Sequence, residues 1–169
     1  DILEHEELKN WNNTKIKHLL NNLCSDEHSI YFECGIARGA SLCSALYKNK
    51  TKAYASDLWL ETKLGKQARD KFLKNFNEFS SNFDGEVNFS DGDCWKISAD
   101  FFDLDKKPNI YYYDAGHSID DHRRAITHFL PILDEYFIMI IDDTTDPRVA
   151  EGSKLGFSDL LDQKLGEVA

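Results

Sequence analysis

Acidic side chains stand at the ends of four of the five segments that have the composition of β-strands. They are Asp57, Asp91, Asp114 and Asp142, while the first segment ends in Glu33-Cys34-Gly35 before a glycine-bearing turn. In an open parallel sheet the carboxyl ends of the strands share one edge, and ligands bind there beside the point where the strand order reverses. We therefore expect these acidic residues to face a ligand.

The turn from Gly35 to Ser41 carries its glycines in the spacing G-x-x-x-G. A dinucleotide-binding turn, G-x-G-x-x-G, needs its second glycine so that a pyrophosphate can approach a helix N-terminus, and Ala37 occupies that position here. The spacing therefore favours a ligand without phosphates. Asp57 follows Gly39 by eighteen residues, where a carboxylate can accept hydrogen bonds from both hydroxyls of a ribose. With the turn 91–95, which can contact an adenine edge, these residues predict an adenosine-type ligand.

Three carboxylates are expected to converge at the ends of the last two strands. Asp114 ends the fourth strand and Asp142 and Asp143 end the fifth, and these strands are neighbours in the expected order 3-2-1-4-5. Such a cluster is costly through mutual repulsion unless a divalent cation that prefers oxygen, such as Mg²⁺, neutralises it. The alternative is that Asp143 caps the following turn and that the pair is a polar strand end.

His117 lies three residues beyond Asp114, at the start of the next predicted helix. Imidazole titrates near neutrality, so His117 is a candidate general base for an acceptor hydroxyl. The alternative is a histidine that packs or caps locally at the helix start. Asp114 and His117 are thus the candidate catalytic residues.

Short β-type runs alternate with helical patterns along the chain, which predicts an α/β fold with a doubly wound, Rossmann-like parallel sheet. The strands are predicted at 29–34, 52–57, 86–91, 109–114 and 136–142, and the helices at 4–23, 39–48, 66–79, 95–101, 119–134 and 148–164. Residues 1–28 are interpreted as an amphipathic helix, with Leu8 and Trp11 on its apolar face, that packs on or covers the core; residues 29–169 form the ligand-binding domain. Ser118 and Asp121 have the spacing of a helix cap.

The composition excludes several classes of protein. The 169 residues carry a net charge of -10, which disfavours nucleic acid as a partner, and 41% are apolar, enough for a core. The four cysteines form no C-x-x-C pair, and no leader or membrane-length apolar run is visible, so we expect a reduced, soluble, cytoplasmic protein without a membrane partner. Tyr111, Tyr112 and Tyr113 are interpreted as the two faces of a buried strand, not as a stacking platform.

The glycine turn, Asp57, the turn 92–94 and the stretches DAGHSIDDHRRAITHFLPIL (114–133) and IDDTTDPRVAEGSKLGF (141–157) together resemble the class I methyltransferases, which use S-adenosylmethionine. More narrowly, they are similar to the metal-dependent small-molecule O-methyltransferases of the macrolide-sugar and cephalosporin-hydroxylase group. The resemblance implies a sixth and an antiparallel seventh strand, and neither is visible after residue 164. The cofactor-binding residues that it implies are Glu33, Gly35, Ala37, Gly39, Ser41, Asp57, Leu58, Asp93, Cys94 and Asp114; the metal ligands are Asp114, Asp142 and Asp143.

The function implied by the resemblance is transfer of the activated methyl group of S-adenosylmethionine to a hydroxyl of a small molecule of sugar or natural-product type, assisted by a divalent metal. Two alternatives stay open: a nicotinamide-dependent oxidoreductase on a similar sheet, which Ala37 disfavours, and a binding module for S-adenosylmethionine without catalysis. The sequence leaves open which acceptor is used and whether the chain forms a homodimer.

Overall fold

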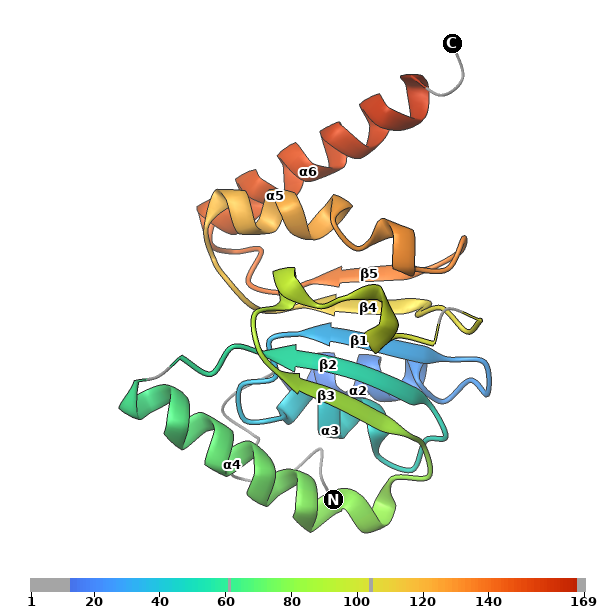
Figure 1. Cartoon of the computed structure of the whole chain (residues 1–169), viewed down its shortest axis with the longest axis vertical. Helices are drawn as coiled ribbons and strands as arrows, with labels where there is room; N and C mark the ends of the chain where they lie inside the picture. The colour runs from blue at the N-terminus through green and yellow to red at the C-terminus, as the bar shows by residue number, and fades with distance from the viewer. Residues whose placement is uncertain (1–12, 61, 104, 167–169) are drawn as a thin grey trace.

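A computed structural model describes residues 13–60, 62–103 and 105–166 and contains one five-stranded sheet with helices on both faces (Figure 1). The strand order is β3-β2-β1-β4-β5 and every pairing is parallel, which confirms the predicted topology. The strands are β1 (Ile30–Cys34), β2 (Lys52–Asp57), β3 (Val87–Asp91), β4 (Ile110–Tyr113) and β5 (Ile138–Ile141).

The helices begin and end where local chemistry favours it. They are α2 (Thr14–Leu23), α3 (Ala40–Leu46), α4 (Lys63–Phe79), α5 (Ile119–Thr127) and α6 (Pro147–Gly166). The Ser118 hydroxyl accepts a hydrogen bond from the Asp121 N–H at 3.0 Å, so the predicted cap of α5 is confirmed. Pro147 begins α6, where its missing N–H leaves no helical bond unmade.

The N-terminal helix packs against α3 through polar as well as apolar contacts. The Asn21 side chain donates to the carbonyl oxygens of Ser44 and Tyr47, each at 2.8 Å, and Leu20 is fully buried. Leu8 and Trp11, which the sequence places on the apolar face of this helix, lie outside the described residues. The division at residue 28 stays a prediction.

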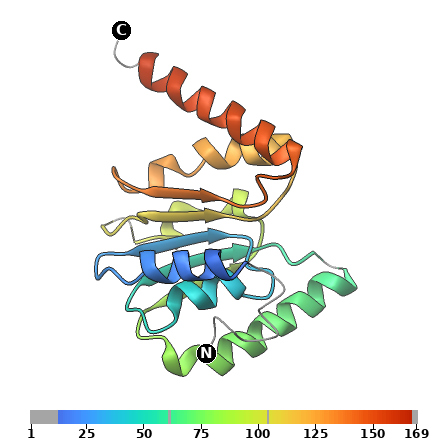
Figure 2. The same cartoon turned by 180° about the vertical axis from the view of Figure 1, so that it is seen from behind.

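The sheet separates two apolar layers because alternate side chains of each strand point to opposite faces. Tyr31 and Tyr112 lie with α2, α3 and α4 on the face turned to the viewer in Figure 2. Tyr111 and Tyr113 lie on the other face with α5 and the segment before β4. All three consecutive tyrosines of β4 are fully buried, as the sequence predicts for a central strand.

Two predicted helices differ from the structure. The prediction of a helix over 95–101 is wrong: this segment forms two short 3₁₀ turns, Cys94–Lys96 and Ala99–Phe101, because its aromatic side chains all pack on one face of the sheet and the backbone must run along it. The helix predicted over 119–134 ends at Thr127. A 3₁₀ turn over Leu130–Ile132 follows, since Pro131 has no N–H and disfavours helical geometry in the residue before it.

Helix α6 packs on α5 through glycines and then extends away from the sheet (Figure 1). A Cβ atom on Gly152 would lie 2.4 Å from the Ile119 carbonyl oxygen, and one on Gly156 would lie 2.6 Å from that of Arg123. The two helix backbones therefore touch directly. Within the described residues, no helix has both the length and the apolarity to cross a bilayer.

Gly35 offers the first test of the fold. Its φ angle is +97°, and a Cβ atom there would lie 1.8 Å from the Asp114 carbonyl oxygen. We expect Gly35→Ala to lower the free energy of unfolding by about 3 kcal/mol, because left-handed strain adds to a backbone collision. Gly92→Ala is the matched control: the nearest neighbour of its Cβ would be the Ser90 hydroxyl at 3.6 Å. Equal urea midpoints for the two variants would contradict the prediction.

Candidate active site

A cavity of about 740 Å³ opens at the carboxyl ends of β1, β2, β3 and β4. Its walls come from the glycine turn, the segment after β2, the turn after β3 and the first residues after β4. This is the edge at which the sequence predicts a ligand. The described lining residues are Gly35, Ala37, Ser56, Asp57, Leu58, Trp59, Leu60, Thr62, Leu64, Gly65, Ala68, Gly92, Asp93, Cys94, Trp95, Tyr113, Ala115, Gly116 and Asp121.

The Asp57 carboxylate is held at the cavity by two backbone donors. Its Oδ2 accepts from the Ala37 N–H and its Oδ1 from the Trp59 N–H, both at 2.7 Å. The Trp59 indole N–H in turn donates to the Ala37 carbonyl oxygen at 3.0 Å, which ties the glycine turn to the segment after β2. A carboxylate has about four acceptor positions, so two stay free for a ligand's hydroxyl groups.

Ala37 and Trp59 both adopt left-handed backbone geometry, with φ angles of +47° and +33°. Residues with a side chain rarely adopt such angles unless the surrounding contacts hold them there. Here the Asp57 carboxylate and the bond from the indole supply those contacts. The left-handed geometry of Ala37 and Trp59 and the position of the Asp57 carboxylate therefore depend on each other.

The turn after β3 forms a second wall. The Gly92 N–H donates to the Asp57 carbonyl oxygen at 2.9 Å, and the Asp93 Oδ1 accepts from the Trp95 N–H at 3.1 Å. Cys94 is buried, and the Trp95 ring stacks on Phe129 with ring centroids 5.7 Å apart. This wall is apolar except for the Asp93 carboxylate, which suits the face of a flat ring.

Glu33 and Ser41 lie beneath the glycine turn and do not line the cavity. Glu33 is fully buried, and its carboxylate accepts hydrogen bonds from the Ser41 hydroxyl and, at 2.7 Å, from the Tyr31 hydroxyl. Burial raises the pKa of this carboxyl from its ordinary 4.5 to about 8, although both hydroxyls act in the opposite direction. In this structure Glu33 supports the turn from below.

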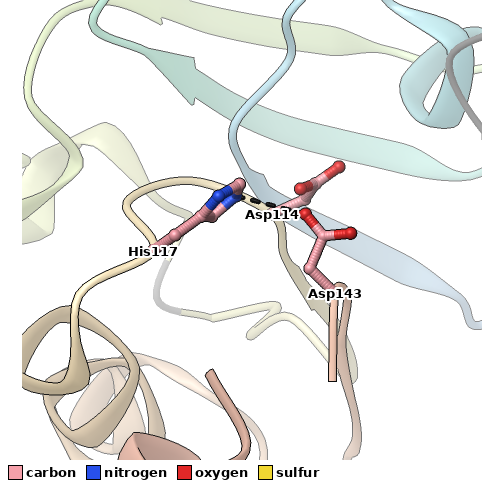
Figure 3. Close-up of side chains that lie close together, drawn as sticks. All are labelled: Asp114, His117 and Asp143. Atoms are coloured by element: carbon pink, nitrogen blue, oxygen red, sulfur yellow. Dashed lines mark ion pairs between the residues drawn. The ribbon is translucent and has the colours of Figure 1, made fainter. Parts of the chain in front are cut away.

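A second group of polar side chains lies where β4 and β5 end. Figure 3 shows His117 and Asp143 pointing toward one another from the loops after the two strands, with Asp114 beside them. The distance from His117 Nε2 to Asp143 Oδ2 is 3.3 Å, and potential ligand atoms of the three residues lie within 4.8 Å of one another. Asp142 instead accepts a hydrogen bond from the Tyr112 hydroxyl.

The Asp114 carboxyl shows the electrostatic strain of this cluster. Burial, followed by the charges of Asp142 and Asp143, raises its pKa from 3.8 to about 7. A bound cation would relieve that strain, and two carboxylates with an imidazole form a reasonable donor set for a divalent metal. The residues present therefore fit a metal ion, with His117 as a potential ligand in addition to the predicted acids.

The structure brings together most of the predicted cofactor residues. Gly35, Ala37, Asp57, Leu58, Asp93 and Cys94 line the cavity, whereas Glu33, Gly39, Ser41 and Asp114 lie beside or beneath it. Sequence reasoning missed Trp59, Tyr113 and Asp121, whereas Trp95 lies in the turn 91–95 that it predicted to contact the ligand. Trp59 and Tyr113 directly adjoin predicted residues in the chain, a signal that could have found them, while Asp121 reaches the cavity only because α5 begins beside it.

Comparison with known proteins supports the same fold. No protein-family profile and no curated protein matches the sequence. An O-methyltransferase from Bacillus cereus solved with SAH superposes with a TM-score of 0.56 at 15% identity, over 85% of this chain and 67% of that one. CalS11, a TDP-rhamnose 3'-O-methyltransferase of calicheamicin biosynthesis, gives 0.58 at 13%, over 88% and 70%. The SAH-bound methyltransferase PaMTH1 of Podospora anserina gives 0.58 at 12%, over 99% and 79%.

The chain therefore has the Rossmann-like fold of class I S-adenosylmethionine-dependent methyltransferases. The cavity lies at the edge of the sheet where ligands bind in folds of this kind. Function depends on the site and not on the fold.

The raised pKa of Glu33 predicts a pH dependence of stability. A folded-state pKa of about 8 against an ordinary 4.5 means that the folded chain keeps a proton that the unfolded chain has lost. This contribution is complete below the unfolded pKa and is lost as pH rises toward the folded value. Between about pH 5 and about pH 8 we expect wild type to lose on the order of 3 kcal/mol relative to Glu33→Gln. Parallel pH profiles of urea unfolding for the two proteins would contradict this.

Proposed function

We propose that this protein is an S-adenosylmethionine-dependent methyltransferase that methylates a hydroxyl of a small molecule. One observation carries the proposal: the Asp57 carboxylate, oriented by the Ala37 and Trp59 N–H groups, stands in a cavity beside a glycine turn that lacks a pyrophosphate-binding glycine. An oriented carboxylate with free acceptor positions suits the two hydroxyls of a ribose. The apolar wall at Cys94 and Trp95 suits the adenine ring.

The charge of the cavity favours a cationic sulfonium over a dinucleotide. Its described lining contains the carboxylates of Asp57, Asp93 and Asp121 and contains no lysine, arginine or histidine. A pyrophosphate would stand uncompensated among these acids, whereas a positively charged ligand is attracted to them. This disfavours the nicotinamide-dependent alternative.

Methyl transfer needs little covalent chemistry from the protein, because the sulfonium of the bound cofactor supplies an activated methyl group. The residues of the chain must align an acceptor hydroxyl and accept its proton. Gly35 packs directly against the backbone of Asp114, so the carboxylate cluster adjoins the cavity. We assign the acceptance of this proton to His117, whose imidazole is half exposed and faces Asp143.

Asp114 and Asp143 would hold a divalent cation such as Mg²⁺ at this place, with Asp142 as an additional carboxylate from the same strand end, while His117 keeps its nitrogen lone pair for the acceptor proton. When bound, such an ion lowers the pKa of an acceptor hydroxyl and holds it in place. The pKa of Asp114, raised by burial and then by the charges of Asp142 and Asp143, supports this assignment, because a bound cation would favour the ionised carboxylate.

The assignment of a small-molecule acceptor rests on the volume of the cavity, about 740 Å³, which lies within the range of small-ligand sites. Two of the superposed proteins are O-methyltransferases by name, and one acts on a nucleotide sugar. The four described cysteines are all free thiols, which supports a reducing compartment such as the cytoplasm.

Calorimetric titration with S-adenosylhomocysteine tests the cofactor. We expect Asp57→Ala to weaken binding by about 2 kcal/mol, because it removes charged acceptors of ribose hydrogen bonds. Asp91→Ala is the matched control: Asp91 ends the neighbouring strand opposite Asp57 but pairs with Arg69 and does not line the cavity. Equal affinities of the two variants would show that the ribose lies elsewhere, and binding of NAD in place of S-adenosylhomocysteine would favour the oxidoreductase.

Turnover tests the cluster once an acceptor is found. We expect activity to stop in EDTA and to return with Mg²⁺, and His117→Ala to lower kcat by about 10² to 10⁴-fold. Isothermal titration of the His117→Ala variant with Mn²⁺ then separates two roles of His117. Loss of a general base leaves the metal affinity unchanged, whereas loss of a metal ligand lowers it. Full activity in chelator would remove the metal from the proposal. Tight cofactor binding without turnover on any acceptor of a hydroxyl panel would favour the non-catalytic module.

A further inference from the structure

Two cysteines meet beneath the cavity, one from the end of β1 and one from the turn after β3. Cys34 of β1 is fully buried and stands in register between Ser56 of β2 and Tyr113 of β4. Side chains in register on neighbouring parallel strands share one face of the sheet, so these three form a row. Ser56 and Tyr113 both line the cavity, and the row therefore runs along its base.

The turn after β3 is held over this row at two points. The Ser56 hydroxyl donates to the Gly92 carbonyl oxygen at 2.9 Å, and the Trp95 ring packs on the Tyr113 ring with centroids 5.8 Å apart. Cys94 lies between these two points in the chain. Its side chain therefore packs over the middle of the row.

The thiols of Cys34 and Cys94 are in hydrogen-bond contact, and both side chains belong to one buried cluster. Cys94 also belongs to the described lining of the cavity, so a small reagent in the cavity can reach it. The other two cysteines, Cys24 and Cys43, are fully buried in other clusters and do not line the cavity. Only the first pair combines a thiol at the cavity with a second thiol beneath it.

This arrangement fixes the order in which the two thiols react. Burial, followed by the contact with Cys94, raises the pKa of Cys34 well above its ordinary 9.0. Cys34 therefore keeps its proton, and it has no path to the cavity except past Cys94. An oxidant in the cavity meets Cys94 first, and an oxidised cysteine beside a second thiol condenses with it.

We propose that Cys94 and Cys34 are a modification site, which hydrogen peroxide in the cavity converts to a disulfide and a nucleoside ligand in the cavity protects. In the first step the Cys94 thiolate attacks the peroxide: an S–O bond forms, the O–O bond breaks, and the departing hydroxide takes up the proton that Cys94 released. In the second step the Cys34 sulfur attacks the sulfenic acid: an S–S bond forms, the S–O bond breaks, and the Cys34 proton leaves with hydroxide as water. Two electrons from the thiol pair thus reduce one peroxide to two waters.

Oxidation of the pair is independent of the proposed methyltransferase function, whereas protection rests on it. The ligand assigned to the wall at Cys94 and Trp95 is the adenine ring of the cofactor. A ring lying against this wall covers Cys94 and keeps peroxide from its sulfur. An occupied cavity should therefore slow the first step.

Peptide mapping of the whole chain after exposure to hydrogen peroxide tests the pair. We expect a disulfide that joins Cys34 to Cys94 and that dithiothreitol reverses, while Cys24 and Cys43 remain free for alkylation once the chain is unfolded. Saturating S-adenosylhomocysteine should slow the formation of this disulfide at least about tenfold, because the exposure of a thiol governs its oxidation.

Two single variants identify the second thiol. Cys34→Ser should abolish the disulfide and leave Cys94 as a sulfenic acid that dimedone labels. Cys43→Ser is the matched control, since Cys43 is also fully buried but belongs to another cluster, and it should form the disulfide at the wild-type rate. The peptide map of the wild-type chain decides the question even if either variant fails to fold.

The outcomes separate the two proposals. Thiols that stay free in peroxide, oxidation of Cys94 to sulfinic acid without a disulfide, or a disulfide to a different cysteine would overturn the modification site. Equal rates with and without bound S-adenosylhomocysteine would overturn the protection. If S-adenosylhomocysteine does not bind the wild-type chain at all, the methyltransferase function fails, and a disulfide between Cys34 and Cys94 in that chain would still support the thiol pair.

Discussion

The structure depends on one close approach, between the turn after β1 and the end of β4. No side chain fits at Gly35, because a Cβ atom added there would lie only 1.8 Å from the Asp114 carbonyl oxygen. The approach places Ala37 where its N–H reaches Asp57, and it places the Asp114 carboxylate beside the cavity. The glycine turn, the ribose acceptor and the carboxylate cluster are therefore parts of one arrangement that begins from a single backbone contact.

Electrostatics gives that arrangement its selectivity. Carboxylates from four strand ends surround the cavity or adjoin it, and burial, followed by the charges of Asp142 and Asp143, raises the pKa of Asp114 to about 7. Such a site attracts cations. A sulfonium cofactor and a divalent metal are both compatible with it, so these two assignments follow from the same distribution of charge.

Much of the fold could be predicted because it rests on local pattern. Tyr111, Tyr112 and Tyr113 indicated a strand buried on both faces, and Ser118 with Asp121 indicated the start of a helix; both are observed. The predictions failed where packing opposed the pattern. A helix was predicted over 95–101, but burying its aromatic side chains on one face of the sheet required an extended path with 3₁₀ turns. Pro131 ended the helical geometry of the next segment.

The sequence by itself determined which acids end the strands, because strand ends follow from local composition, and parallel topology then brings those ends to one edge. Only the tertiary structure decided where each side chain points. Glu33 turns beneath the glycine turn toward Ser41 and Tyr31, Asp142 turns toward Tyr112, and His117 faces Asp143. The physical reason is that a hydrogen bond needs partners that are close in space, and the fold alone brings together partners such as Tyr112 and Asp142, which are thirty residues apart in the chain.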